Sequence, residues 1–310
     1  MSMKISTALL FDRATDRMST LQNRLAHTQA QMATTKQVIS PSDAPDQAAV
    51  IQRLRGEVDR QESHAATLKV AMNRYAAEET ALTGANDILL RIKDLAIQAA
   101  NDTVAPADRE AIAAEMEALR NQLVSLGNSK DDAGNYLFSG TRVNTPAFAE
   151  DEAGYVVYQG DQTQTRIPAG VERTVAFTRA GTDVFTRVTR EDGQGGVSSV
   201  SFFESLDDLV AGLRNNVGAD IRNGLNEVDQ MMSGVNVALA QTGADQQVVQ
   251  SQLDVLDETA LRLKSTLSDV EDLDYTTAVT QMNKELTALQ AAMSSFGKIS
   301  GLSLFDYVQP

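Results

Sequence analysis

Apolar side chains recur in alternating steps of three and four residues from Ile51 to Ala99, and this spacing limits the folds open to the chain. It predicts one helix over about residues 46–100, roughly 80 Å long at 1.5 Å per residue. A globular enzyme seldom contains so long a helix. The stripe consists of Ile51, Leu54, Val58, Gln61, Ala65, Leu68, Met72, Tyr75, Glu79, Leu82, Ala85, Leu89, Ile92, Ala96 and Ala99.

A weaker three-and-four spacing of apolar residues occurs near both ends of the chain. About a third to a half of the first seam is small or polar, so its helix is marginal alone and needs a partner. The elements follow the same order from either end, and we therefore expect the first and last helices to pair, and the inner helices likewise. The first seam is Phe11, Ala14, Met18, Leu21, Leu25, Thr28, Met32, Thr35 and Ile39, and the last is Val279, Met282, Leu286, Leu289, Met293 and Phe296.

Short segments interrupt these helices. Two prolines within 40–45 end one helix and start another, the segment 102–106 makes a turn, and Gly127 and Gly243 are typical of helix ends. The acidic step at 271–274 interrupts the last seam, and it is either a solvated kink or a functional joint. The predicted hinge residues are Pro41, Pro45, Glu271, Asp272 and Asp274.

Between about residues 135 and 200 the composition changes to Val, Tyr, Thr and Phe punctuated by Gly, Asn and Asp, which predicts a β-rich insertion. The expected fold is mainly α with a small β domain: a long antiparallel coiled-coil stalk built from both chain ends, with the insertion at its far end. We expect three domains. They are a terminal coiled-coil domain of 1–42 and 276–310, a helical rod domain with a β-hairpin of 43–140 and 201–275, and a β-rich outer domain of 141–200.

Composition argues against several classes of function. The formal net charge of −15 disfavours a nucleic-acid partner, which needs a cationic surface. A chain without cysteine has no disulfide, no catalytic thiolate and no Cys-ligated zinc. The apolar run from Ile5 to Phe11 is too short for a secretory signal or a membrane span, so we expect neither a cleaved signal peptide nor membrane insertion.

No set of residues points to catalysis, a metal or a cofactor, and we expect none. His27 and His64 lie off the apolar seams, which is typical of surface histidines. The carboxylate pairs at 78–79 and 207–208 diverge by about 100° on a helix and are expected on a solvated face. The stretch 191–196 lacks the lysine of phosphate loops and the alternating aspartates of calcium loops, and is expected to be a flexible loop.

Six short motifs follow one another along the chain outside the β insertion. They are Met3-Lys4-Ile5-Ser6-Thr7, Ser40-Pro41-Ser42-Asp43-Ala44-Pro45, Asn135-Tyr136-Leu137-Phe138-Ser139-Gly140, Ser268-Asp269-Val270-Glu271-Asp272-Leu273-Asp274-Tyr275, Leu289-Gln290-Ala291-Ala292 and Ser303-Leu304-Phe305-Asp306-Tyr307-Val308. Each is weak alone, but together they resemble the flagellin-like proteins of the bacterial flagellum, and most closely those of the junction between hook and filament. The ending 304–308 is unlike the Leu-Leu-Arg close of flagellins.

The resemblance implies a structural, non-enzymatic protein that is exported unfolded by the flagellar type III apparatus to the outside of the cell. The implied partners are copies of itself in a ring, hook-associated protein 1, flagellin, and an export chaperone on the C-terminal helix. Marginal terminal helices suit this role, because they stay unfolded in transit and bury their seams on assembly. The expected assembly interface is Phe11, Met18, Leu21, Leu25, Met32, Val279, Met282, Leu286, Leu289, Met293 and Phe296.

Two alternatives stay open. A flagellin would share the terminal helices, and filament formation by the purified protein alone would favour it. A cytosolic coiled-coil scaffold would share only the periodicity, and retention inside the cell without dependence on flagellar export would favour that hypothesis.

Overall fold

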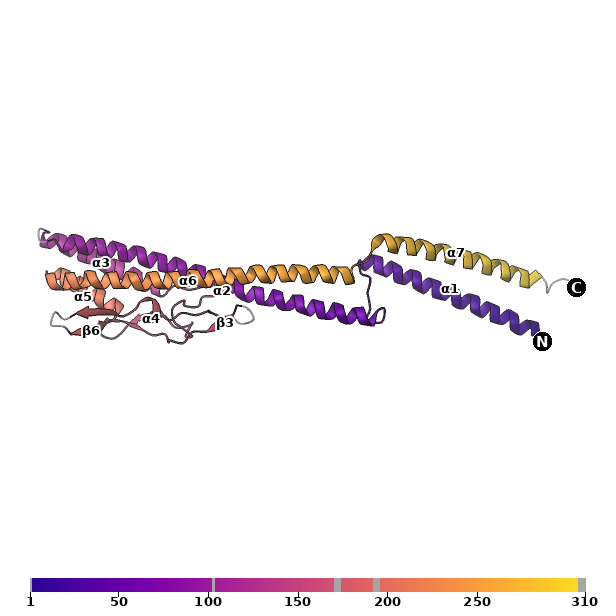
Figure 1. Ribbon diagram of the computed structural model, residues 1–310, viewed down its shortest axis with the longest axis horizontal. Coiled ribbons are helices and arrows are strands. Elements are labelled where there is room, and N and C mark those ends of the chain that lie inside the picture. The colour runs from indigo at the N-terminus through magenta and orange to yellow at the C-terminus, as the bar shows by residue number, and fades with distance from the viewer. Residues whose placement is uncertain (1, 102–103, 170–173, 192–195, 306–310) are drawn as a thin grey trace. The chain divides into compact units, whose positions relative to one another are not determined.

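The computed structural model describes residues 2–101, 104–169, 174–191 and 196–305, most of them helical (Figure 1). A mainly α fold with a small β part is thereby confirmed. The helices of the described residues are α1 (Ser2–Thr34), α2 (Pro45–Ala99), α3 (Pro106–Gly127), α4 (Gly181–Val184), α5 (Phe202–Arg214), α6 (Gly218–Glu271) and α7 (Tyr275–Phe305).

Contacts divide the chain into two compact units. One unit comprises Met1–Glu62 together with Glu258–Pro310, and the other comprises Ser63–Asp257. The first contains the paired terminal helices α1 and α7, whereas α3, α4, α5 and all the strands belong to the second. The division into three domains stays a prediction.

The ends of helices α2 and α3 lie where the sequence predicts them. Pro45 is the first residue of α2, a position where its missing N–H costs nothing. Just before it, the Asp43 carboxylate accepts the backbone N–H groups of Ile39 and Ser40 at 3.2 and 2.8 Å. Helix α3 ends at Gly127, where a Cβ would lie 2.8 Å from the Phe148 ring, so this glycine also allows close packing.

The predicted helix end at Gly243 is wrong, because α6 continues through it from Gly218 to Glu271. A single glycine costs a helix only about 1 kcal/mol relative to alanine. That cost is offset here because α6 buries side chains on both sides of Gly243, among them Val235 and Val249.

The main core of the second unit combines apolar side chains of α2, α3, α5 and α6 with those of the β part. Phe148 lies at its aromatic centre: its ring centroid is 5.1 Å from those of Phe185 and Phe203 and 5.5 Å from that of Tyr158. Edge-to-face and tilted contacts of this kind add to the free energy of burial. The β part is therefore held by the helices rather than by a sheet of its own.

Three antiparallel hairpins of short strands make up the β part of the described residues. No strand exceeds four residues, and such ribbons are unstable unless they pack on something else. Residues 192–195 of the predicted flexible loop lie outside the described residues. The pairs are β1 (Phe148–Glu150) with β2 (Val156–Tyr158), β3 (Arg166–Pro168) with β4 (Thr174–Ala176), and β5 (Val188–Glu191) with β6 (Val197–Val200).

One turn occurs twice in this region, at the sequences Asp-Asp-Ala-Gly and Asp-Glu-Ala-Gly. In each, the first aspartate (Asp131 or Asp151) accepts the N–H groups two and four residues later at 2.9–3.0 Å. The glycines, Gly134 and Gly154, have φ of +83° and +86°, a region that favours glycine. The repeated sequence thus specifies two similar tight turns.

The expectation that the neighbouring carboxylates lie on a solvated face is wrong for Glu78, and Asp207 is half-buried rather than fully solvated. Glu78 is buried between Arg74 and Arg179, with Oε2 3.3 Å from Nε of Arg179. Burial raises the pKa of Glu78, and the two arginines oppose that effect. Asp207 accepts two hydrogen bonds from the Arg120 guanidinium, at 2.9 and 3.0 Å.

The physical reason is that consecutive helical side chains point about 100° apart. One member of each pair therefore turns toward an arginine distant in the sequence, Arg179 for Glu78 and Arg120 for Asp207, and the charges offset each other. Glu79 and Asp208 are exposed, as expected.

Substitution of Gly127 tests the contact with Phe148. Gly127→Ala should lower the free energy of unfolding by about 1–3 kcal/mol, because its methyl group overlaps the ring. Gly243→Ala is the matched control: no heavy atom lies within 4 Å of an added Cβ, so the substitution should stabilise the helix by about 0.5–1 kcal/mol. Urea unfolding followed by circular dichroism measures both changes. Equal stability of Gly127→Ala and the unsubstituted protein would contradict the close contact.

Candidate assembly interface

Helices α1 and α7 run antiparallel and pack against each other, as expected for the two chain ends (Figure 1). The rings of Phe11 and Phe296 meet edge to face with centroids 5.3 Å apart. Further along the pair, the Thr28 hydroxyl donates to Glu285 Oε2 at 3.0 Å, and both residues are buried. The two termini are therefore held together by side chains more than 250 positions apart in the sequence.

The predicted interface residues are only partly covered within the chain. All but one are half-buried, and Met293 is 55% exposed. A row of incompletely buried apolar side chains is typical of surfaces that other chains cover. Their role in assembly stays a prediction. These residues are Phe11, Met18, Leu21, Leu25, Met32, Val279, Met282, Leu286, Leu289, Met293 and Phe296.

Sequence reasoning missed a polar contact inside this seam. Thr28 looks like a weak position in an apolar row, yet its hydroxyl binds one oxygen of Glu285 while the Gln281 amide donates to the other at 2.8 Å. A buried carboxylate needs such donors, because burial without them is costly. The signal in the sequence is Glu285 itself, an acidic residue directly beside the seam residue Leu286.

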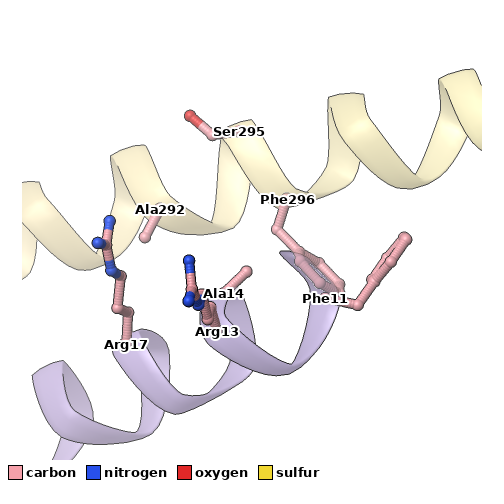
Figure 2. A pocket seen from close by; sticks show the side chains of 7 residues that line it. All are labelled: Phe11, Arg13, Ala14, Arg17, Ala292, Ser295 and Phe296. Carbon is pink, nitrogen blue, oxygen red and sulfur yellow. The ribbon is translucent and has the colours of Figure 1, made fainter. Parts of the chain in front are cut away.

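A groove of about 340 Å³ opens between the two helices (Figure 2). Two guanidinium groups project into it from α1, while phenylalanine rings and alanine methyl groups supply apolar walls. Cationic groups beside apolar surface suit a partner that is itself acidic and partly apolar. The lining residues are Phe11, Arg13, Ala14, Arg17, Ala292, Ser295 and Phe296.

The chain leaves α1 through a sharp turn at Thr35, whose φ of 57° is in the left-handed region. The Gln37 N–H donates to the Glu271 carbonyl at 2.8 Å, and the Leu273 N–H donates to the Thr35 carbonyl at 3.0 Å. These bonds hold the segment after α1 beside the segment after α6. The predicted seam positions Thr35 and Ile39 therefore lie beyond the helix, which ends at Thr34.

Glu271 is the electrostatic centre of this joint. Its buried carboxylate forms an ion pair with Lys36 and accepts Nη2 and Nε of Arg55 at 2.5 and 3.2 Å. Burial opposes ionisation of Glu271, but the hydrogen bonds and charges of Arg55 and Lys36 outweigh it, so its pKa lies below the ordinary 4.5. A solvated kink therefore does not describe Glu271, and its role as a hinge stays a prediction.

The other predicted hinge residues border this joint. Asp272 pairs with Lys36 in an isolated antiparallel bridge. Asp274 caps α7: its carboxylate accepts the Thr276 N–H at 2.9 Å and the Thr277 hydroxyl at 2.7 Å, which lowers its pKa. Pro41 is exposed in the loop before α2, and Pro45 begins that helix.

The described residues offer little for other kinds of site. Within them, no group of three or more His, Asp or Glu side chains is placed to hold a metal ion. His64 is exposed and His27 is half-buried.

The helices can also be compared with the requirements of a membrane span. Throughout the part of the chain that the structure describes, every helix falls short of the length and apolar character that a membrane span requires.

Comparison with known proteins matches both ends of the chain. The bacterial flagellin N-terminal helical region matches residues 5–143, and the C-terminal helical region matches residues 225–308. Flagellar hook-associated protein 3 of Escherichia coli K12 is 26% identical over 320 residues, covering 98% of this chain and 99% of that protein. Flagellin of Bacillus subtilis 168 is 23% identical over 255 residues, 79% of either chain.

A solved structure shares the fold. The crystal structure of FlgL from Xanthomonas campestris matches with a TM-score of 0.62 and 24% identity, over 70% of this chain and 99% of that one.

Removal of the Glu271 charge tests the joint. Glu271→Gln should reduce the hydrogen-exchange protection of the Gln37 and Leu273 amides about 10- to 100-fold, because a charged hydrogen bond contributes about 1.5–3 kcal/mol. Glu258→Gln removes an exposed pair with Arg262 and serves as the control, with little expected change.

The same exchange experiment has a defined pH dependence. Since the pKa of Glu271 is lowered by folding, its contribution is complete above the ordinary value of 4.5 and is lost as the pH falls through the lower folded value. The difference in protection between Glu271→Gln and the unsubstituted chain should therefore persist at pH 5 and shrink in stronger acid. A difference that is the same at all pH values would contradict the assignment.

Proposed function

The chain belongs to the flagellin family and is a structural protein of the bacterial flagellum, and we propose that it forms the junction between the hook and the flagellin filament. A hook-associated relative that matches nearly the whole chain supports the junction rather than the filament, since the flagellin relative matches a smaller part. The observation that carries the mechanism is the pairing of α1 with α7, which leaves their apolar seams half-exposed.

Assembly completes the burial of those seams. Each large apolar side chain that moves from water into a packed interface contributes about 1.5–3 kcal/mol. The terminal helices are weakly apolar, so they gain their full stability when neighbouring subunits cover them. Binding and ordering of the chain ends therefore occur together.

The partners in this proposal are copies of the same chain arranged in a ring, with hook-associated protein 1 on one side and flagellin on the other. Before assembly an export chaperone covers the C-terminal helix α7, whose exposed side chains include Met293. The place of action is outside the cell, after export through the flagellar type III apparatus. The proposal involves no catalysis.

Deletion of the gene separates the candidate functions. Hooks examined by electron microscopy and flagellin measured in the medium give three distinct patterns. Bare hooks with flagellin shed into the medium support a junction protein. Bare hooks without shed flagellin support a filament subunit, and intact filaments support a cytosolic scaffold.

Leu286→Asp tests the seam. The substitution should abolish filament attachment in the complemented deletion strain, because a charge would have to be dehydrated in the interface. The second unit should keep its circular dichroism and its unfolding transition, since Leu286 lies outside it. Thr287→Asp places the same charge on the neighbouring exposed position and serves as the control. Normal motility of the Leu286→Asp strain would contradict the proposed interface.

A further inference from the structure

Helix α1 carries two adjacent pairs of like charges near its start. Asp12 and Asp16 are four residues apart, and Arg13 and Arg17 repeat the same spacing one position later. All four side chains are exposed, and none of them forms an ion pair or a side-chain hydrogen bond with another described residue. Like charges at this spacing disfavour a helix, and the opposite charges of Arg13 and Asp16, three residues apart, offset part of that repulsion. These exposed carboxylates and guanidinium groups are therefore available to pair with a second molecule.

The two pairs point in different directions. Consecutive residues of a helix are rotated by about 100°, so the acidic stripe of Asp12 and Asp16 stands beside the basic stripe of Arg13 and Arg17. Arg24 continues the basic stripe, because it follows Arg17 by seven residues. A helix with opposite charges on neighbouring faces is complementary to a second copy of itself.

The basic stripe of Arg13 and Arg17 lines the groove between α1 and α7. Arg13 and Arg17 project into the groove between α1 and α7, beside Ala14 and the rings of Phe11 and Phe296 (Figure 2). The small side chain of Ala14 lies beside Arg13, and the rings of Phe11 and Phe296 supply apolar surface at one end of the groove. Pairs of guanidinium and carboxylate groups are strengthened in such surroundings.

The charge of the terminal helices agrees with this assignment. Together α1 and α7 contain six Lys and Arg but only three Asp and Glu, in a chain whose formal net charge is −15. The pair is thus cationic, and an acidic group of another subunit is a favourable occupant of its groove.

We propose that Asp12 and Asp16 of one copy enter the groove of the next copy and pair with its Arg13 and Arg17. The contact uses a different face on each copy, so it repeats from subunit to subunit and is compatible with a closed ring. This inference rests on the proposed junction function, and it identifies the residues that set the order of neighbouring subunits. The acidic pair of one subunit acts as the ligand and the groove as its receptor.

Charge exchange tests the proposal in a strain that lacks the gene. One variant carries Asp12→Arg and Asp16→Arg, a second carries Arg13→Asp and Arg17→Asp, and a third carries all four substitutions. Either double variant alone should lower the number of attached filaments by at least about tenfold and shed flagellin, because like charges then face each other. The fourfold variant should restore attachment, as should the two double variants produced together, since both arrangements recover opposite charges.

A control variant separates specific pairing from net charge. Asp87→Arg with Asp94→Arg makes the same change in charge at exposed positions of α2 and should leave attachment intact. The secreted amount of every variant is measured, so that comparison is made at equal export.

Disulfide trapping gives a readout independent of motility. The chain has no cysteine, so introduced cysteines have no background. Arg17→Cys combined with Asp16→Cys should give covalent multimers on oxidation of isolated hooks, because adjacent helical residues are too close to form a disulfide within one chain, whereas Asp16→Cys alone should not. Disulfide dimers of Asp16→Cys alone would show a symmetric contact and overturn the proposal.

The outcomes distinguish this inference from the proposed function. If the deletion strain keeps its filaments, the junction function fails and the inference fails with it. If deletion sheds flagellin but both double variants attach filaments normally, only the inference is overturned. A fourfold variant that sheds as much flagellin as the double variants overturns it too, and indicates that these charges meet anionic lipid or a different flagellar protein.

Discussion

Each long helix of this chain has to bury its apolar side against a segment far away in the sequence, and the rest of the structure depends on that constraint. Helix α1 packs on α7, with Thr28 buried against Glu285. A second, smaller core joins α2 to α6 through side chains such as Leu68 and Leu253. Neither half of the chain therefore completes its own core, and closure of these long loops has to precede most of the favourable contacts.

Arginine and carboxylate pairs join the elements at specific points. Arg179, just before α4, donates hydrogen bonds to Glu78 of α2 and to the Thr242 hydroxyl of α6, and Arg190 of β5 donates two to Glu227 of α6. The planar guanidinium donates several hydrogen bonds in fixed directions, so it links segments with defined geometry. These contacts attach the short hairpins to the long helices, which the few ladder bonds of three- or four-residue strands do not achieve alone.

The first unit combines a defined joint with an incomplete interface. At the joint, Glu271 forms ion pairs with Lys36 and Arg55 while backbone hydrogen bonds connect the segments on either side. The paired helices beyond it leave their seams half-exposed and present unpaired charges along α1. A joint held by ion pairs, followed by incompletely buried helices, is the arrangement expected of a subunit whose terminal helices are covered by neighbours.

Periodicity and punctuation in the chain specify the local elements. The three-and-four spacing predicts α2, the prolines of 40–45 mark its start, and Gly127 marks the end of α3, because these features act through the backbone of nearby residues. The pairing of the terminal helices also follows, since weak seams need partners.

Tertiary structure alone decided which of these local preferences prevailed. Gly243 lies inside a helix because packing on both sides outweighs its small cost. Glu78 and Asp207 turn inward because arginines distant in the sequence meet them, and Thr28 is a buried donor because Glu285 lies across the seam. Local spacing carries no information about such partners, since the energy of a buried charge depends on groups that only folding brings together.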